Sequence, residues 1–172
     1  METPMPAEKS RRNSLRLPQY DYADFGAVFV TICTHQRQAL FGIITNGEVE
    51  LSPPGIAVQS AWNRLPSRFP HVELDEFIIM PDHLHGILIT ATSQSPETQS
   101  VLLGDVINAF KNMVIAAWRC GVRDEDWPRY HEHLWQRAFY DHVISDERDL
   151  NAIREYILGN PIRWEQKRRG YM

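Results

Sequence analysis

Apolar residues along this chain form short runs rich in β-branched and aromatic residues, separated by longer stretches with helical spacing. Runs of the first kind favour strands. A further pair of short β-prone pieces flanks Asn46-Gly47, a dipeptide typical of a two-residue hairpin turn. The pattern therefore predicts a hairpin over residues 41–51 and strands over residues 26–34, 72–80, 83–90 and, as a short extended segment, 134–144.

Two stretches in the middle of the chain have the apolar spacing of amphipathic helices. The first runs from about Pro54 to Leu65 and carries Trp62 toward a sheet. The second runs from Val101 to Trp118 with a broad apolar face, and Gly121 is expected to end it because glycine is common just after a helix.

A third helix is predicted near the end of the chain. It begins near Ser145 or Asp146, whose side chains suit an N-cap, and it stops by Asn160 because Pro161 disfavours a helical conformation at the residue before it. One apolar stripe on this helix is expected to dock it on the sheet. The stripe consists of Leu150, Ile153 and Ile157.

The order of these elements is strand, hairpin, helix, two strands, helix, strand, helix. Such an order predicts an α+β fold with a mostly antiparallel sheet. We expect a ferredoxin-like sheet with helices packed mainly on one face.

Composition is typical of a soluble globular protein, with 43% apolar and 23% charged residues among 172. No apolar run approaches the roughly 20 residues that span a bilayer, so no membrane association is expected. Cys33 and Cys120 lack the spacing of a metal site, and the N-terminus does not resemble a signal peptide. These features predict a cytoplasmic location.

Basic charge gathers at the two ends of the chain. Residues 1–20 carry a balance of +2 and residues 152–172 a balance of +3, so the remaining residues carry −9 within the formal total of −4. We divide the chain into a basic, partly disordered arm (1–19), a single domain (20–165) and a basic tail (166–172). Such ends act either as phosphate-binding arms or as solubilising tails.

His83 and His85 open the fourth β-prone run and offer the first candidate chemistry. Side chains at i and i+2 of a strand point to the same face, so two imidazoles can reach one ion. The alternative is that these two histidines only make hydrogen bonds with other residues and bind no metal.

Tyr156 and Asn160 lie one turn apart on the last predicted helix, and they can bring a phenol and an amide to the same place. The alternative for these two is a tyrosine packed at the core edge and an asparagine that ends the helix.

Three blocks of sequence carry a resemblance to a known family. They read Met-Pro-Asp-His-Leu-His (80–85), Trp-Gln-Arg-Ala-Phe-Tyr-Asp-His-Val-Ile (135–144) and Arg-Glu-Tyr-Ile-Leu-Gly-Asn-Pro-Ile-Arg-Trp (154–164). In this order they resemble the signature blocks of the single-tyrosine HUH transposases. The match is closest to the REP-associated tyrosine transposases, which process repetitive palindromic DNA, and the resemblance covers about residues 18–165.

The resemblance implies a metal-dependent reaction in which Tyr156 is the nucleophile. It implies His83 and His85 as ligands of Mg²⁺ or Mn²⁺, with Asn160 as the third ligand where insertion-sequence relatives carry Gln. Attack by the phenol on a backbone phosphorus leaves a 5′-phosphotyrosine and a free 3′-hydroxyl, which later permits strand transfer. No nucleotide cofactor is required.

Further residues are expected to support this site or to bind the substrate. Asp82 and His142 match residues that the family often carries and are interpreted as supporting residues. The expected partner is single-stranded or hairpin DNA, and the chain is expected to act as a monomer or a homodimer. The basic ends would contact phosphates. Their candidate residues are Arg11, Arg12, Arg16, Lys167, Arg168 and Arg169.

Two other classes of function compete with this hypothesis. One is a hairpin DNA-binding protein that has kept the fold but not the chemistry. The other is a metal hydrolase that combines the histidine pair with a third histidine elsewhere. The candidates for that third ligand are His71, His131 and His133.

Overall fold

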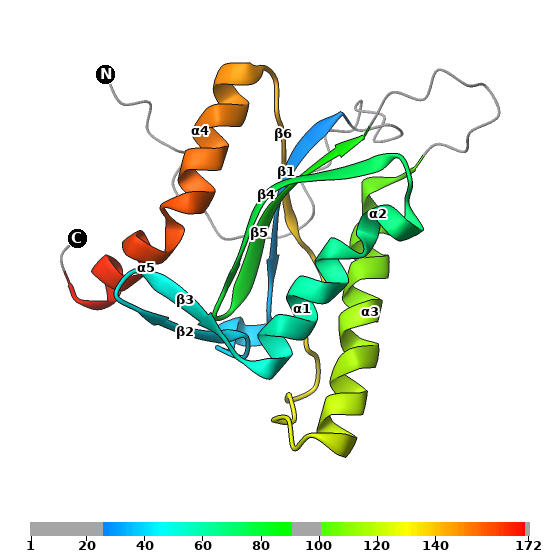
Figure 1. Cartoon of the computed structure of the whole chain (residues 1–172), viewed down its shortest axis with the longest axis vertical. Helices are drawn as coiled ribbons and strands as arrows, with labels where there is room; N and C mark the ends of the chain where they lie inside the picture. The colour runs from blue at the N-terminus through cyan, green and yellow to red at the C-terminus, as the bar shows by residue number, and fades with distance from the viewer. Residues whose placement is uncertain (1–25, 91–100, 171–172) are drawn as a thin grey trace.

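The computed structural model describes residues 26–90 and 101–170. Its main element is a four-stranded sheet in which every neighbouring pair is antiparallel, in the order β4-β5-β1-β6 (Figure 1). A separate two-stranded hairpin lies beside it. The strands are β1 (Ala27–Cys33), β2 (Gly42–Thr45), β3 (Glu48–Leu51), β4 (Val72–Met80), β5 (His83–Thr90) and β6 (Tyr140–Val143).

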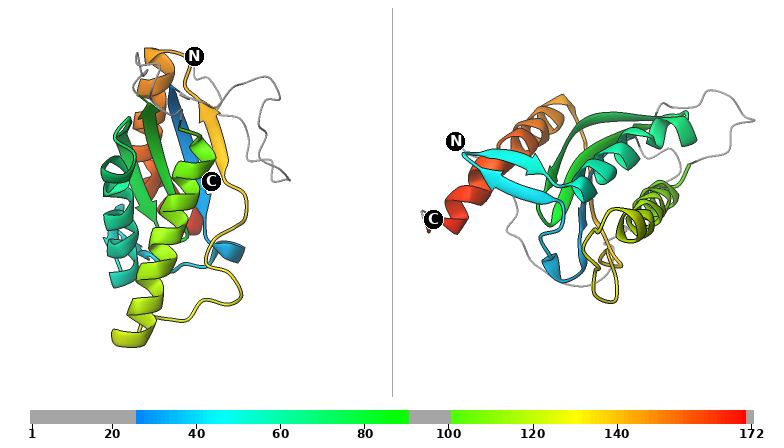
Figure 2. Two further views of the ribbon diagram at one scale, coloured as in Figure 1. Left: turned by 90° about the vertical axis from the view of Figure 1, so that its right-hand side faces the viewer. Right: turned by 60° about the horizontal axis from the view of Figure 1, so that its bottom comes forward.

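Helices cover both faces of the sheet. Figures 1 and 2 show α1 and α3 on one side and α4 on the other. The order β1-α1-β4-β5-α3-β6 with this strand arrangement is ferredoxin-like, so the predicted α+β class is confirmed. The helical elements are η1 (His35–Arg37), α1 (Pro53–Asn63), α2 (Leu65–Arg68), α3 (Leu103–Asp124), α4 (Glu147–Leu158) and α5 (Asn160–Arg168).

The larger core lies between the sheet and helices α1 and α3. Alternate residues of β1 and β5 point into it, among them Ile32 and Leu84, which are fully buried. Trp62 of α1 and Phe110 of α3 meet edge to face inside this core, with ring centroids 5.3 Å apart. The sheet is therefore anchored on this side by large apolar side chains.

The opposite face of the sheet carries a smaller apolar cluster. Phe29 of β1 and Ile87 of β5 pack there against Ile153 and Ile157 of α4, with Leu150 at its edge. This contact confirms that the predicted apolar stripe docks the last helix. The expectation of helices mainly on one face holds for α1 and α3, whereas α4 covers the second face, so the central strands β1 and β5 carry buried residues on both sides.

The predicted hairpin is confirmed. Asn46 and Gly47 have φ angles of 54° and 76°, the left-handed conformations that a primed two-residue turn requires. Strands β2 and β3 contact α5, and Ile162 of α5 lies next to Gly47. The hairpin therefore packs against the end of the chain and not within the main sheet.

Gly121 does not end its helix, so that prediction is wrong. Helix α3 continues to Asp124, and the Trp127 ring lies where a Cβ atom on Gly121 would stand, 2.1 Å from its nearest atom. Glycine at this position permits the close approach of an indole. Gly121 is therefore needed for its lack of a side chain and not for an unusual backbone conformation.

The last predicted helix ends as expected, and a further helix follows it. Helix α4 ends at Leu158, and Pro161 lies in the first turn of α5, where proline is tolerated. Helix α5 runs to Arg168, three residues into the segment interpreted as a tail. Within residues 26–90 and 101–170, none of the helices is long and apolar enough to cross a membrane.

Candidate functional site

The two histidines of the His-x-His pair lie side by side at the start of β5, on the face that α4 covers. Their Nε2 atoms are 3.0 Å apart, and their side chains are 3% and 5% exposed. Leu84 between them points into the larger core on the other face. The alternation of a strand thus places both imidazoles together, as the i and i+2 spacing predicted.

Each histidine has a separate partner for its other ring nitrogen. Nδ1 of His83 bonds the Asp82 carboxylate at 2.5 Å, and Nδ1 of His85 bonds the Thr31 hydroxyl at 2.8 Å. Thr31 reaches His85 because the two residues are directly paired between β1 and β5. These bonds orient both rings so that the Nε2 atoms face one another.

Electrostatics favour the neutral form of His85. Burial lowers the pKa of its imidazole well below the usual 6.5, and the neighbouring His83 and the Arg37 guanidinium lower it further. A neutral imidazole is the form that binds metal ions. His85 therefore remains able to ligate a metal at neutral pH.

The donor set of the histidine pair fits a divalent ion. Two nitrogens at right angles and about 2.1 Å from one ion are about 3.0 Å apart, which is the separation of the two Nε2 atoms. Bonds from Nδ1 to a carboxylate or hydroxyl are typical of metal-binding histidines. In the described part of the chain, no three His, Cys, Asp or Glu side chains gather around a metal position. Among the described residues, a third protein ligand would be of another type, such as an amide.

The Tyr156 ring contacts the same site from α4. Its centroid lies 5.4 Å from that of His85 and 6.1 Å from that of Phe29, which itself stacks on His85. The Arg163 guanidinium also lies over the Tyr156 ring, 5.2 Å from its centroid, and donates to the Tyr156 carbonyl at 3.0 Å. The phenol thus stands beside the histidine pair within one chain.

Asn160 lies at the junction of the two last helices. It is the first residue of α5 and is 7% exposed, so it does not share one helix with Tyr156 as the spacing predicted. The bend at Gly159 separates them. One turn further along α5, the Trp164 ring lies 5.7 Å from His83. In sequence, Asn160 therefore lies between Tyr156, which contacts His85, and Trp164, which contacts His83.

His142 connects the edge strand β6 to the start of α4. Its Nε2 atom lies 3.0 Å from Asp149, whose carboxylate also accepts from the Ser145 backbone N–H at 3.1 Å. Asp146 caps the helix by accepting from the Asp149 N–H, as predicted. His142 thus supports the helix that carries Tyr156.

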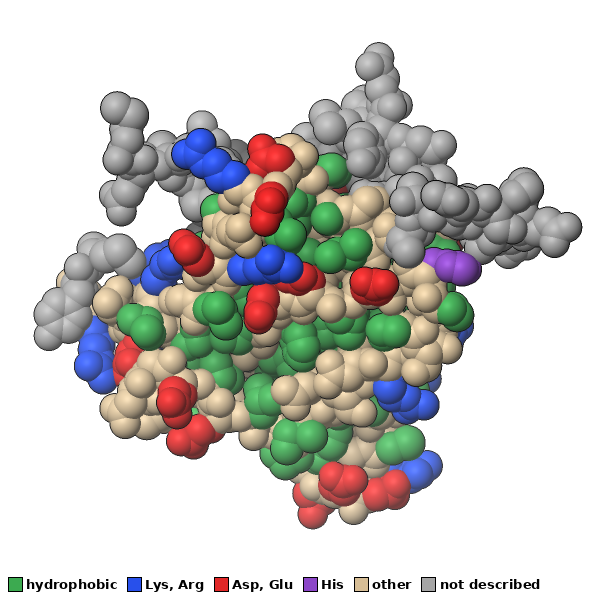
Figure 3. All heavy atoms as spheres, turned by 45° about the horizontal axis from the view of Figure 1, so that its top comes forward, with side chains coloured by type: hydrophobic (Ala, Val, Ile, Leu, Met, Phe, Trp, Pro, Cys, Tyr) green, Lys and Arg blue, Asp and Glu red, His purple; other side chains and the backbone are tan. Residues whose placement is uncertain are grey.

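The predicted phosphate-binding residues fall in two groups. Arg11, Arg12 and Arg16 lie outside the described residues. Lys167 and Arg168 form the last turn of α5, and Arg169 follows it with a 2.7 Å bond to Glu165. In the view of Figure 3, acidic and basic side chains are interspersed, with no large area of a single charge.

Two of the three histidines named for the hydrolase alternative, His131 and His133, lie in a loop elsewhere, and the third, His71, directly precedes β4. His133 meets His35 edge to face at 5.6 Å, and His131 and His35 both approach Glu132. These contacts do not include the His83 and His85 pair. The structure therefore offers that pair no third histidine from this loop.

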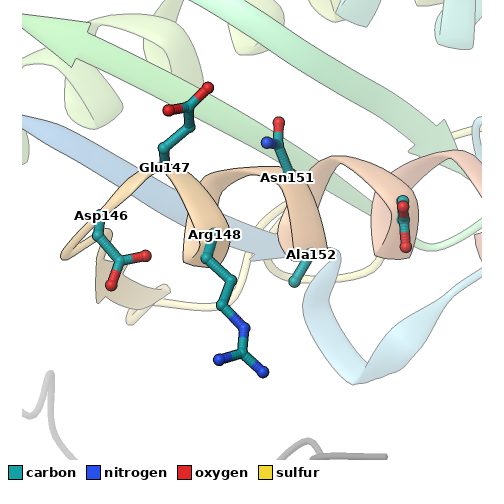
Figure 4. Close-up of a pocket in the computed structure, with 6 residues that line it drawn as sticks. Asp146, Glu147, Arg148, Asn151 and Ala152 are labelled. Atoms are coloured by element: carbon teal, nitrogen blue, oxygen red, sulfur yellow. The ribbon is translucent and has the colours of Figure 1, made fainter.

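A shallow depression near the start of α4 is formed by this one segment. Figure 4 shows Asp146, Glu147, Arg148, Asn151 and Ala152 around it, with charged ends directed outward. Neither histidine of the pair is among the residues that line it.

Sequence reasoning missed four residues at the site. Arg163 and Trp164 lie inside the third signature block, so proximity in sequence to Asn160 was a usable signal. Thr31 could be found only from the register of β1 against β5. Arg37, which pairs with Asp82 at 3.0 Å, follows a strand and has no sequence signal of its own.

Comparison of the sequence with known proteins finds two related proteins of Haemophilus influenzae. An uncharacterized protein is 36% identical over 184 aligned residues, covering 96% of this chain and 97% of the relative. A protein named as a REP-associated tyrosine transposase is 26% identical over 106 residues, covering 61% of this chain and 57% of the relative. No protein-family model matches the chain.

Solved structures of transposases share the fold. A REP-associated tyrosine transposase bound to a REP hairpin matches with a TM-score of 0.59 and 20% identity over 84% of this chain and 72% of the other. A transposase structure from Deinococcus radiodurans matches with a TM-score of 0.51 and 18% identity over 87% of this chain and 95% of the other. The chain therefore belongs to one family with the full-length Haemophilus influenzae relative, and it is similar to REP-associated tyrosine transposases in sequence and in fold.

Proposed function

We propose that this protein nicks single-stranded DNA and transfers strands through a 5′-phosphotyrosine, with Mg²⁺ or Mn²⁺, at hairpin-forming repeats. The observation that carries the proposal is the contact of the Tyr156 ring with His85 beside a histidine pair whose separation suits one ion. The similarity to transposases supports the class of reaction. The solved relative bound to a REP hairpin supports hairpin DNA as the substrate.

In this proposal His83 and His85 hold the ion through their Nε2 atoms, and Asn160 is the third protein ligand. The bound ion would polarise the scissile phosphate and offset its negative charge. The other ring nitrogens stay bonded to Asp82 and Thr31, which keeps the two donors aimed at one point.

Tyr156 supplies the nucleophile. Its phenol oxygen loses a proton and attacks the phosphorus, the bond from phosphorus to the 3′ oxygen breaks, and that oxygen takes up a proton to become a free 3′-hydroxyl. The product is a 5′-phosphotyrosine, which a 3′-hydroxyl can later attack to reverse the reaction. A phenol is a weak nucleophile at neutral pH, so polarisation of the phosphate by the bound ion would assist the attack.

The test is formation of a covalent adduct on a single-stranded hairpin oligonucleotide with Mn²⁺. We expect Tyr156→Phe to abolish the adduct and to leave hairpin affinity within about twofold, because only the attacking oxygen is removed. Tyr140→Phe is the matched control, since Tyr140 lies on the same face and also contacts Phe29 but is 51% exposed on β6. Its adduct yield should equal that of the wild type.

Two results would contradict the proposal in different ways. An adduct that persists in Tyr156→Phe would show that another residue is the nucleophile. Wild-type protein that binds the hairpin equally with and without divalent ions, and forms no adduct, would instead support a DNA-binding protein without catalytic activity.

A further inference from the structure

The turn that precedes the histidine pair is enclosed by a segment from a distant part of the sequence. Residues 34–41 follow β1 and wrap around Pro81 and Asp82. The Asp82 carbonyl accepts from both the N–H and the hydroxyl of Thr34 at 2.9 Å, and the Pro81 carbonyl accepts from Leu40 and Phe41 at 2.8 and 3.0 Å. These bonds hold the backbone of the turn independently of any charged side chain.

Arg37 is the residue of this segment that reaches the Asp82 carboxylate. Its Nε lies 3.0 Å from Asp82 Oδ2, and its Nη1 donates to Cys33 at 2.8 Å. Asp82 is 5% exposed, whereas the Arg37 side chain is 39% exposed. A carboxylate buried to this degree is costly unless a positive group pairs with it.

The backbone that presents Arg37 has an uncommon conformation. Gln36 and Arg37 have φ angles of 53° and 57°, which L-residues other than glycine adopt at a cost. Two such residues in succession turn the chain so that the guanidinium faces Asp82. The surrounding structure thus holds Gln36 and Arg37 in unfavourable backbone conformations, and these conformations place the Arg37 side chain next to Asp82.

The two oxygens of Asp82 then join two groups. Oδ2 bonds Arg37, and Oδ1 bonds Nδ1 of His83, whose Nε2 faces His85. We propose that Arg37 is a positioning residue that acts through Asp82 to fix the His83 ring for metal binding. Asp82 cannot rotate away from His83 without leaving the guanidinium, so the ring and its donor atom keep one orientation.

This inference rests on the proposed function because it requires that the histidine pair binds a divalent ion. Its test measures metal binding by the full chain without DNA. Arg37→Gly is the informative variant, because glycine adopts a φ of 57° without strain while the whole arginine side chain, with its guanidinium, is removed. We expect the Mn²⁺ dissociation constant, measured by electron paramagnetic resonance, to rise about tenfold.

Controls separate this role from a general effect on folding. Arg123→Gln removes an exposed arginine paired with Asp124 at 2.7 Å and should leave Mn²⁺ affinity unchanged. Arg37→Gly leaves the buried Asp82 carboxylate without its guanidinium, so its melting temperature should fall, and Mn²⁺ affinity is compared at a temperature where both proteins are folded. The absorption spectrum of bound Co²⁺, which reports ligand geometry, should change in Arg37→Gly and not in Arg123→Gln.

A double-mutant cycle tests whether Arg37 acts through Asp82. Asp82→Asn alone should weaken Mn²⁺ binding, and adding Arg37→Gly should weaken it no further. Additive losses would overturn the inference, as would wild-type affinity in Arg37→Gly, and both results would leave the proposed function intact. A wild-type chain that binds no Mn²⁺ would overturn the inference together with the metal-dependent reaction.

Discussion

The two faces of strand β5 differ in what their side chains contact. Leu84 and Leu88 are fully buried in the larger core, and Gly86 between them leaves room for the Trp62 ring, since a Cβ there would stand 2.5 Å from it. On the other face, His83 and His85 bond Asp82, Thr31 and each other. Successive residues of β5 therefore point alternately into an apolar core and into a polar site.

This difference shows how a buried polar site is kept rigid. The apolar face supplies large side chains that hold β5 in place, and on the other face ring contacts and hydrogen bonds fix the two imidazoles. The polar face carries only a small apolar cluster around Phe29 and Ile157, which leaves one side of the imidazoles to Tyr156 and Trp164. Stability and chemistry can thus be altered separately by substitutions at alternate positions.

The largest expected effect comes from the polar face. His85→Ala removes one of two imidazole donors, and we expect adduct formation on a hairpin oligonucleotide to fall by at least about 10³-fold. Mn²⁺ binding by calorimetry should be lost in parallel. A variant that retained adduct formation near the wild-type rate would show that this face is not the reaction site.

The adjacent position on the apolar face should give the opposite result. Leu84→Ala leaves a cavity in the larger core, and we expect the free energy of unfolding in urea to fall by about 3 kcal/mol. Mn²⁺ affinity of the folded fraction should remain within about twofold of the wild type. A large loss of affinity without loss of stability would show that the two faces are not independent.

Much of the fold could be predicted because each strand and helix carries its own local signal. The alternation in β5, the Asn46-Gly47 turn and the apolar stripe of α4 each depend on residues close in sequence. Gly121 was misread because a glycine that accommodates Trp127 and a glycine that ends a helix look alike in sequence. The end of α4 before Asn160 was predicted from Pro161, but a second helix that starts at Asn160 was not.

Only part of the candidate site followed from the sequence. The shared face of His83 and His85 is a property of any strand, and Asp82 is next to them. Thr31 and Arg37 join the site through contacts with residues 54 and 45 positions away, which depend on strand register and on the path of residues 34–41. Partners set by such contacts have no periodicity to reveal them.

The smallest expected effect concerns how α4 is held to the polar face. Arg154 of α4 makes a two-bond pair with Asp75, at a bulge in β4, and its guanidinium holds the pKa of that carboxyl below the usual 3.8. A carboxyl whose pKa is lower in the folded state stabilises the fold above pH 3.8, and this contribution is lost as pH falls through the folded pKa. The larger core lies on the other face and does not depend on this pair.

We therefore expect Asp75→Asn to lower the melting temperature by about 2–3 °C at pH 7, because the Arg154 side chain is 37% exposed and solvent limits the strength of the pair. The difference from the wild type should shrink as pH falls below 3.8, since protonation then removes the same charge from the wild type. Asp124→Asn, which breaks the fully exposed pair with Arg123, should change the melting temperature much less. A difference for Asp75→Asn that stayed constant across this pH range would mean that its charge does not hold α4, and that the apolar contacts of Ile153 and Ile157 alone fix the helix carrying Tyr156.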